Sequence, residues 1–376
     1  MMRRAILALG MFVLASSAAA QGTLSTQGFG YPSGGLSAKV IAGGGGFAEF
    51  DATSTRNPAS LLGWGRTGLY IQYDPEFRSI AAGSRSENTV TARFPLIAAG
   101  FPIGSRAMIS LSATTLLDRT WETLFHSGQR LGPDSVEFNE RVQSTGGIAD
   151  MRLAGAYAFS SKFAVGLGVH SIGGENRLNL TRTFDDSLKY GTLKRNYNLG
   201  FQGSGISLGA VWRPVRAMAI AASWAHGGGL EMKSADTVLA KGDAPGRYGV
   251  GLRFDAIPGV SLAASFNHTL WSGLQPLGSA TLQAKDGNDL GVGADLSGPR
   301  MRSVPIMLHV GVRQRDLPFS VNGTDVTERQ YAGGATLPFG GPRAAFDVGL
   351  IRASRSQTSG VNEHAWIVSI GFNVHP

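Results

Sequence analysis

From Arg66 onwards, apolar residues alternate with small or polar residues along most of the chain. The last segment is the clearest case. There one face carries His364, Trp366, Val368, Ile370, Phe372 and Val374, and the other carries Ala365, Ile367, Ser369, Gly371 and Asn373. A period of two is typical of a β-strand whose faces meet two different environments. We therefore expect the apolar faces to meet lipid and the small or polar faces to point into a lumen.

This alternation predicts an all-β protein, a transmembrane antiparallel β-barrel of about fourteen strands over residues 66–376. The expected strands begin near residues 66, 88, 105, 136, 161, 190, 204, 217, 246, 259, 303, 328, 343 and 363. Bacterial single-chain barrels prefer even strand numbers, so twelve and sixteen stay open. The soluble alternatives are an all-β sandwich and a periplasmic β-propeller. Both would need charged outer faces that the alternation lacks.

The connections between these strands fall into two kinds. Proline and glycine mark tight turns at 213–216, 255–259 and 339–342, where they set special backbone angles. Longer polar stretches at 128–135, 231–245 and 273–302 are expected to be extracellular loops. Trp212 and Trp271 stand near expected strand ends, where they fit an interfacial aromatic girdle.

The first twenty residues have the layout of a cleavable signal peptide. Arg3 and Arg4 precede an apolar run at 5–14, and small residues at 16–20 offer a cleavage site before Gln21. The run is too short to span a bilayer, and the alternative is a buried N-terminal helix. Beyond it we find no uncharged apolar stretch long enough for a transmembrane helix. We therefore expect export to the bacterial outer membrane.

Composition supports this class. Glycine accounts for 53 of 376 residues, about twice its ordinary share, and only 16% of residues are charged. The absence of cysteine excludes disulfides and thiolate metal sites. The net charge of +8 falls to +6 without Arg3 and Arg4, and this favours anionic ligands or lipopolysaccharide phosphates over nucleic acid in an exported chain.

Residues 21–65 differ from the rest of the chain. They are rich in glycine, most of all at Gly43, Gly44, Gly45 and Gly46, and show little alternation. Such a stretch stays ordered only by packing inside something larger. The alternative is a flexible periplasmic tail.

Candidate catalytic and metal motifs are few. The seven histidines lie at positions 126, 170, 226, 268, 309, 364 and 375. None stands in a Gly-x-Ser-x-Gly elbow or an H-E-x-x-H pair, although pairing of distant residues in space stays open. The stretch 286–291 begins like a calcium loop, but Ser297 stands where a bidentate glutamate is needed. We expect no catalytic residues, no metal and no cofactor.

Several short motifs resemble the FadL/TodX-type outer-membrane transporters of hydrophobic compounds. Asn57, Pro58 and Ala59 match that family's Asn-Pro-Ala motif, and the preceding 35–38 and 43–48 resemble its small-residue hatch. Further similar stretches lie at 207–214, 245–254 and 268–272. The chain departs from the family in its shorter loops, and residues 372–376 do not end on the terminal aromatic residue of many such barrels, so that Phe372 is the candidate insertion signal.

The resemblance implies uptake of hydrophobic small molecules, first of all long-chain fatty acids. It implies a hatch at 21–65 in which Asn57, Pro58 and Ala59 are the anchor and Gly43 to Gly46 give freedom to move. Expected partners are the hydrophobic ligand, outer-membrane lipid and lipopolysaccharide, and the barrel-insertion machinery. The alternatives are a structural barrel of a secretion or surface-attachment machine and a general diffusion porin.

The third strand contains a candidate opening in the wall. Ile109, Leu111 and Ala113 share one parity, which the following Thr114 and Thr115 interrupt. The resemblance implies a bulge there that lets ligand leave sideways into the membrane. An ordinary extension of the barrel rim is the alternative.

Overall fold

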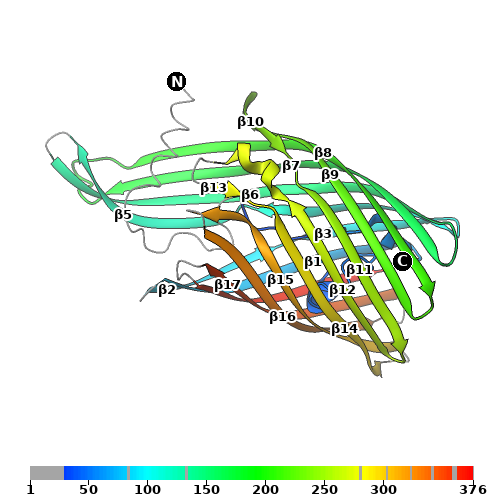
Figure 1. The fold of residues 1–376 in the computed structure, drawn as a ribbon. Coiled ribbons are helices and arrows are strands. Elements are labelled where there is room, and N and C mark those ends of the chain that lie inside the picture. The colour runs from blue at the N-terminus through cyan, green and yellow to red at the C-terminus, as the bar shows by residue number, and fades with distance from the viewer. Residues whose placement is uncertain are drawn as a thin grey trace.

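The computed structural model describes residues 29–82, 85–131, 134–278, 282–301, 304–321, 324–339, 343–357 and 362–375. Within them, fourteen antiparallel strands pair in a closed ring (Figure 1). The fold class is therefore the predicted all-β antiparallel barrel. The predicted signal peptide at 1–20 lies outside the described residues.

The ring contains β1 (Gly68–Ala82), β3 (Leu96–Ile103), β4 (Ala107–Asp118), β6 (Asp134–Ala158), β7 (Phe163–Phe184), β8 (Leu193–Val215), β9 (Met218–Ser234), β11 (Gly246–Ile257), β12 (Val260–Leu270), β14 (Gly287–Met301), β15 (Val304–Val321), β16 (Thr324–Phe339), β17 (Ala344–Gln357) and β18 (Asn362–Val374), which pairs with β1. Four further strands extend single members of the ring: β2 (Arg85–Arg93) on β1, β5 (Trp121–Leu131) on β6, β10 (Thr237–Asp243) on β9 and β13 (Leu282–Ala284) on β15. The described helices are α2 (Ala38–Ala42), η2 (Pro58–Trp64) and η3 (Trp271–Leu277).

The predicted strand number is confirmed, but three of the expected boundaries were wrong. The strand expected near 88 corresponds to β2, an extension of β1, whereas the ring continues with β3 from Leu96. The segments expected near 190 and 204 are one continuous strand, β8. Conversely, β14 lies within the stretch 273–302 that was expected to be a loop. Asp286, the start of the calcium-like stretch, accepts a hydrogen bond from Ser272 N at 2.8 Å just before this strand.

The predictions of loops at 128–135 and 231–245 were also largely wrong. Most of 128–135 lies in the β5–β6 hairpin, and most of 231–245 lies in β9 and β10. β6 reaches 25 residues, whereas about ten suffice to cross a bilayer. Outside the bilayer no lipid imposes an apolar outer face on a strand, so the lipid–lumen alternation ends although the hydrogen-bonded ladder continues. The long hairpins project to the left in Figure 1.

The two faces of the barrel wall are as predicted. In β7 and β8, Leu167 and Leu208 are 54% and 47% exposed, whereas Ser207 between such positions is 2% exposed. Trp212 is also exposed on the outside. Trp271, in contrast, is buried in η3 inside the barrel, so its assignment to the aromatic girdle was wrong. The outer face is apolar and the lumen is polar, as in transmembrane barrels.

None of the helices in the described ranges is both long and apolar enough to cross a membrane.

Residues 29–65, here called the luminal segment, lie inside the ring (Figure 1). Helix α2 packs against β15 to β18, and η2 packs against β4 and β6 to β8. Most residues of the segment are buried, which a flexible tail would not be. The segment therefore connects opposite sides of the barrel wall.

Candidate functional site

The Asn-Pro-Ala motif begins η2 and ties it to the wall. Asn57 Oδ1 accepts a hydrogen bond from Ala59 N at 2.9 Å, while Asn57 Nδ2 donates to the carbonyls of Ala210 and Ala222 in β8 and β9. Pro58 occupies the first helical position, where its missing N–H costs nothing. A Cβ on Gly209 would lie 1.9 Å from Asn57 Oδ1, so only glycine lets the motif approach this closely.

The four glycines at 43–46 also serve close packing. A Cβ on Gly44 would lie 2.3 Å from Val312 N, and one on Gly46 would lie 2.5 Å from Gly293 N. Gly44 and Gly45 additionally have positive φ angles of 62° and 77°. These glycines bring the segment's backbone against β14 and β15. The freedom of movement predicted for them stays a prediction.

A local polar cluster holds the luminal segment in shape. Asp51 pairs with Lys39 at 2.7 Å and accepts hydrogen bonds from Ser37, Thr53 and Ser54. Burial alone would raise the pKa of Asp51, but the Lys39 ammonium and the serine hydrogen bonds outweigh burial and lower this pKa to about 2. The carboxylate is therefore charged at neutral pH and fixes α2 to the rest of the segment.

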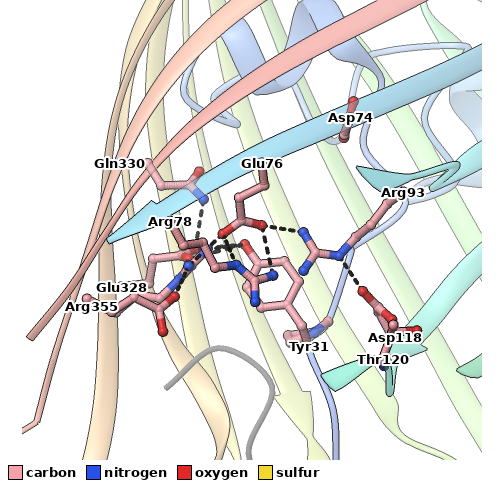
Figure 2. Close-up of polar contacts among 12 residues, drawn as sticks. Tyr31, Asp74, Glu76, Arg78, Arg93, Asp118, Thr120, Glu328, Gln330 and Arg355 are labelled. Carbon is pink, nitrogen blue, oxygen red and sulfur yellow. Dashed lines mark hydrogen bonds and ion pairs between the residues drawn. The ribbon is translucent and has the colours of Figure 1, made fainter. Parts of the chain in front are cut away.

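Tyr31 lies at the centre of a buried charged cluster (Figure 2). The guanidinium groups of Arg93, Arg315 and Arg355 lie 4.5, 4.7 and 4.9 Å from its ring centroid. Its hydroxyl donates to Glu328 Oε2 at 3.1 Å. Such cation–π contacts gain strength when the groups are desolvated.

Each arginine of this cluster has a carboxylate partner. Arg355 contacts Glu76, Glu328 and Glu363, and Arg315 donates to Glu328 at 2.6 Å. We define the Tyr31 network as Tyr31 with four arginines and four carboxylates: Arg78, Arg93, Arg315, Arg355, Glu76, Asp118, Glu328 and Glu363. The network joins β1, β2, β4 and β15 to β18 around the start of the luminal segment.

The wall has a break beside Tyr31. β3 pairs with both β1 and β4. Beyond β3 the wall continues as two separate ladders, because β2 pairs with β1 whereas β5 pairs with β6. Within the described ranges no pairing joins β2 to β4 or β5, and the two diverge in Figure 1. The backbone of Tyr31 pairs with Asp118 at this position, with both N–H···O distances at 2.8 Å.

The predicted bulge residues lie at the edge of this break. Thr115 N donates to Pro95 O at 3.0 Å, beyond the Leu96–Thr114 pair that ends the ladder between β3 and β4. The β4–β6 register then shifts between Thr115 and Leu117. Thr114 and Thr115 are therefore next to a change in strand pairing. Their role in ligand exit stays a prediction.

On the side of the luminal segment that faces the long hairpins, the lumen contains a packed apolar cluster beside the Tyr31 network, here called the apolar chamber. Phe29 and Tyr31 pack there against side chains from the wall and from η3: Leu117, Ile148, Ile172, Phe201, Leu230, Ala244, Trp271, Leu274, Leu277, Leu317, Phe319 and Val326. Between this apolar chamber and the segment lies a cavity of about 110 Å³. Its lining includes Gly34, Gly35 and Arg56 of the segment.

The lumen also contains a Ser–His–Asp arrangement that sequence spacing did not reveal. His170 Nδ1 lies 2.9 Å from Asp150 Oδ1, and His170 Nε2 lies 2.8 Å from Ser207 Oγ. The opposite wall has a matching bridge of Asp295, His309 and Thr336. A catalytic serine must be reachable by substrate, but Ser207 is almost fully buried and outside the cavity lining. We therefore assign both bridges to cross-linking of adjacent strands.

Over the described ranges, no group of three or more His, Asp or Glu side chains is placed to hold a metal ion.

Sequence reasoning missed Tyr31, Arg56 and Arg247 of β11. Arg56 directly precedes the Asn-Pro-Ala motif and is the only arginine in residues 21–65, which was a usable clue. Tyr31 and Arg247 offered no such clue, because their partners are distant in the sequence.

The sequence itself matches no protein-family model and none of the curated proteins. Solved structures do match. The Pseudomonas putida toluene transporter TodX is 12% identical, covers 91% of this chain and 99% of its own, and gives a TM-score of 0.60. A Pseudomonas aeruginosa FadL homologue is 13% identical with 93% and 99% coverage and a TM-score of 0.59. The Ralstonia pickettii toluene transporter TbuX is 17% identical with 91% and 98% coverage and a TM-score of 0.58. The chain therefore has the fold of the FadL/TodX-type channels, as the sequence motifs predicted.

Proposed function

We propose that this protein is an outer-membrane channel for the uptake of hydrophobic small molecules. Long-chain fatty acids are the first ligand class to test. In this proposal the luminal segment is a hatch, and ligand passes from the apolar chamber through the break between β2 and β5 into the membrane.

The observation that carries the proposal is the order of features along the lumen. An apolar chamber lies on one side of a packed segment, and the break in the wall opens beside that segment. A hydrophobic ligand gains free energy from such a chamber but nothing from a water-filled pore. The structural similarity to a FadL homologue and to two toluene transporters supports the same class of ligand.

The motif residues have distinct roles in this proposal. Asn57, Pro58 and Ala59 anchor the hatch to β8 and β9. Gly43 to Gly46 let the hatch pack closely on β14 and β15 and separate from them without rearranging side chains. Residues 1–20 act as the signal peptide that exports the chain.

A general porin would need an open polar path, and the packed segment disfavours it. A structural barrel in a secretion or surface-attachment machine would need a stable protein partner. Both alternatives give distinct results in the experiment below.

The test is native mass spectrometry with lipid extraction on protein purified from its own outer membrane in mild detergent. We expect retained fatty acid or another hydrophobic molecule in the wild type. In Asn57→Ala the amount should change, because the hydrogen bonds to Ala210 and Ala222 are lost. Asn196→Ala, at an exposed position in β8, is the matched control and should retain the wild-type amount.

Two results would overturn the proposal. One is an empty barrel that conducts ions in planar bilayers, which would identify a porin. The other is an empty barrel that co-purifies in fixed ratio with a periplasmic or surface protein, which would identify a structural component.

A further inference from the structure

On β16 to β18, aromatic residues border the apolar outer face of the wall at both ends. Near the short turns, Phe339, Phe346 and Phe372 pack on one another, with ring centroids 6.4, 5.5 and 6.0 Å apart. Towards the long hairpins, Tyr331 and Trp366 are 63% and 47% exposed on the outer face. Aromatic girdles of this kind mark the two interfaces of a transmembrane barrel. Tyr331 and Trp366 therefore lie at the level of lipid head groups.

The strand register identifies the leaflet to which this level belongs. Trp366 pairs with Phe77 of β1, and at this position β1 already pairs with its extension β2 through Phe77 and Val90. β2 lies on the same side of the barrel as the long hairpins (Figure 1). Because the longer connections of transmembrane barrels are extracellular, the level of Trp366 belongs to the outer leaflet of the outer membrane.

Two arginines stand on the outer face at this level. Arg352 of β17 lies opposite Tyr331 of β16 on one side and opposite Trp366 of β18 on the other. Arg329 lies one outward position closer to the hairpins, opposite Ser354. We define the rim patch as these five outward residues on two adjacent rungs of the ladder.

Neither arginine of the rim patch has a carboxylate partner. Arg329 Nε donates to the neutral side chain of Gln314 at 3.2 Å, and the Arg352 guanidinium lies 5.2 Å from the centroid of the Trp366 ring. Among the residues that the structure describes, no carboxylate oxygen lies within 4.0 Å of either guanidinium group. Arg329 is exposed and Arg352 is half-buried, so both remain accessible from the outside.

Nearby acidic residues are engaged elsewhere. Glu328 and Glu363 are fully buried on the luminal side of the wall and belong to the Tyr31 network. Asp316 accepts hydrogen bonds from the backbone of β14 and from a threonine of β16, and Asp325 pairs with Lys285 at 2.6 Å. The rim patch therefore presents positive charge that the protein itself does not neutralise.

The two guanidinium groups extend in opposite directions along the wall. Arg329 reaches towards β15 and Arg352 reaches towards β18, while Tyr331 and Ser354 occupy the outward positions beside them. Leu350, one outward position closer to the membrane centre than Arg352, is 51% exposed. The patch thus offers two separate positions for anions directly above a lipid-facing apolar surface.

We propose that the rim patch binds the lipid A part of lipopolysaccharide, with one phosphate at Arg329 and the other at Arg352. Basic side chains at a membrane surface attract anionic head groups, and the guanidinium fork matches a phosphate in shape and charge. Lipid A carries two phosphates on one disaccharide, and its acyl chains cover the apolar surface at Leu350. The inference rests on the outer-membrane location in the proposed function and not on the molecule that the channel transports.

The test is native mass spectrometry of the full-length mature protein in non-ionic detergent. The probes are diphosphoryl lipid A, monophosphoryl lipid A and phosphatidylglycerol. We expect the wild type to bind one diphosphoryl lipid A tightly. Monophosphoryl lipid A and phosphatidylglycerol should each bind about fivefold more weakly, since one basic side chain at a membrane surface adds roughly that factor. Inorganic phosphate in excess should not displace lipid A, because it lacks acyl chains.

Arg329→Gln and Arg352→Gln should each weaken the binding of diphosphoryl lipid A by about fivefold, and the double variant by about 25-fold. In each single variant the two forms of lipid A should bind with similar affinity, because only one phosphate position remains. Arg216→Gln is the matched control, since Arg216 is exposed in the short turn between β8 and β9 at the other end of the barrel. The shift on heating in gel electrophoresis shows that each variant retains the folded barrel.

Three results would overturn the inference. If the wild type binds both forms of lipid A and phosphatidylglycerol equally, the patch does not recognise the two phosphates. If both single variants bind diphosphoryl lipid A as the wild type does, the lipid binds elsewhere. If inorganic phosphate displaces lipid A, the patch is a site for soluble anions. The proposed function fails separately, in the lipid extraction experiment above, if the barrel itself is empty.

Discussion

The lumen contains two groups of buried arginines that differ in their surroundings. In the Tyr31 network, each arginine contacts a carboxylate, and Arg355 alone contacts three. In the second group, Arg56, Arg152 and Arg247, the closest carboxylate within the described residues lies 3.6 Å from Arg56 and is shared with Arg313. The first group joins strands, whereas Arg152 and Arg247 of the second group donate to backbone carbonyls of the luminal segment.

This difference predicts that the two groups respond differently to substitution. Arginines and carboxylates that pair fully with one another have no charge left to bind a ligand. Removing one member leaves the buried charge of its partner uncompensated. Charges that meet only backbone carbonyls keep part of their desolvation cost and are available to an anion. Four predictions, ordered by the size of the expected effect, test this distinction and the other polar contacts of the lumen.

The largest effect is expected for Arg355→Met. It leaves Glu76, Glu328 and Glu363 buried beside one another and should lower the free energy of unfolding by about 3–5 kcal/mol. Arg247→Met, in contrast, removes a poorly compensated cation and should change stability by less than about 1 kcal/mol. Urea unfolding in detergent, followed by tryptophan fluorescence, measures both. Equal losses would remove the distinction between the two groups.

Acid should release the luminal segment. The pKa of Asp51 is lowered from its ordinary 3.8 to about 2, so its stabilisation is complete above pH 4 and is lost as the pH falls towards 2. The shift corresponds to about 2 kcal/mol. Pepsin should therefore cut within residues 29–65 increasingly fast between pH 4 and pH 2. Asp51→Asn should be cut readily across this range, and a wild-type-like profile in this variant would contradict the assignment.

Tyr31→Phe should have a smaller effect. It removes the hydroxyl that contacts Glu328, Arg315 and Arg355 but keeps the ring between the guanidinium groups. We expect a loss of about 1 kcal/mol in the same urea experiment. A loss as large as that of Arg355→Met would show that the hydroxyl, and not the ion pairs, holds the network together.

The smallest effect is expected for Ser207→Ala, which removes a neutral hydrogen bond to His170 worth about 1 kcal/mol or less. Ligand binding should be unchanged, and a fluorophosphonate probe should not label the wild type. Labelling that disappears in Ser207→Ala would identify a reactive serine and reassign the Asp150–His170–Ser207 bridge to hydrolysis.

Much of the barrel could be predicted because the alternation of apolar and polar residues has a local physical cause. Lipid on one side and a polar lumen on the other impose alternation on each strand, as at Leu208 and Ser207. In the long hairpins this cause is absent, and pairing continues without that signature in the sequence. In β14 the signature is present, because exposed Leu290 and Val292 alternate with Gly291 and Gly293, but the prediction assigned the stretch to a loop.

The site was predictable only in part. The Asn-Pro-Ala motif was visible because a proline after a capping residue is a local feature, and Asn57 caps η2 as such a residue does. The roles of Tyr31 and Arg247 depend on partners from distant strands. The contact of Tyr31 with Arg355, for example, spans 324 residues.

The sequence by itself determined that the chain forms a barrel, which faces of the strands meet lipid, and that the N-terminal segment must pack inside something larger. The tertiary structure alone decided which buried charges are paired. Pairing depends on distances of a few ångströms between side chains of strands that meet only when the ring closes. It therefore separates the balanced Tyr31 network from Arg56, Arg152 and Arg247, although both groups contain arginines that face the lumen.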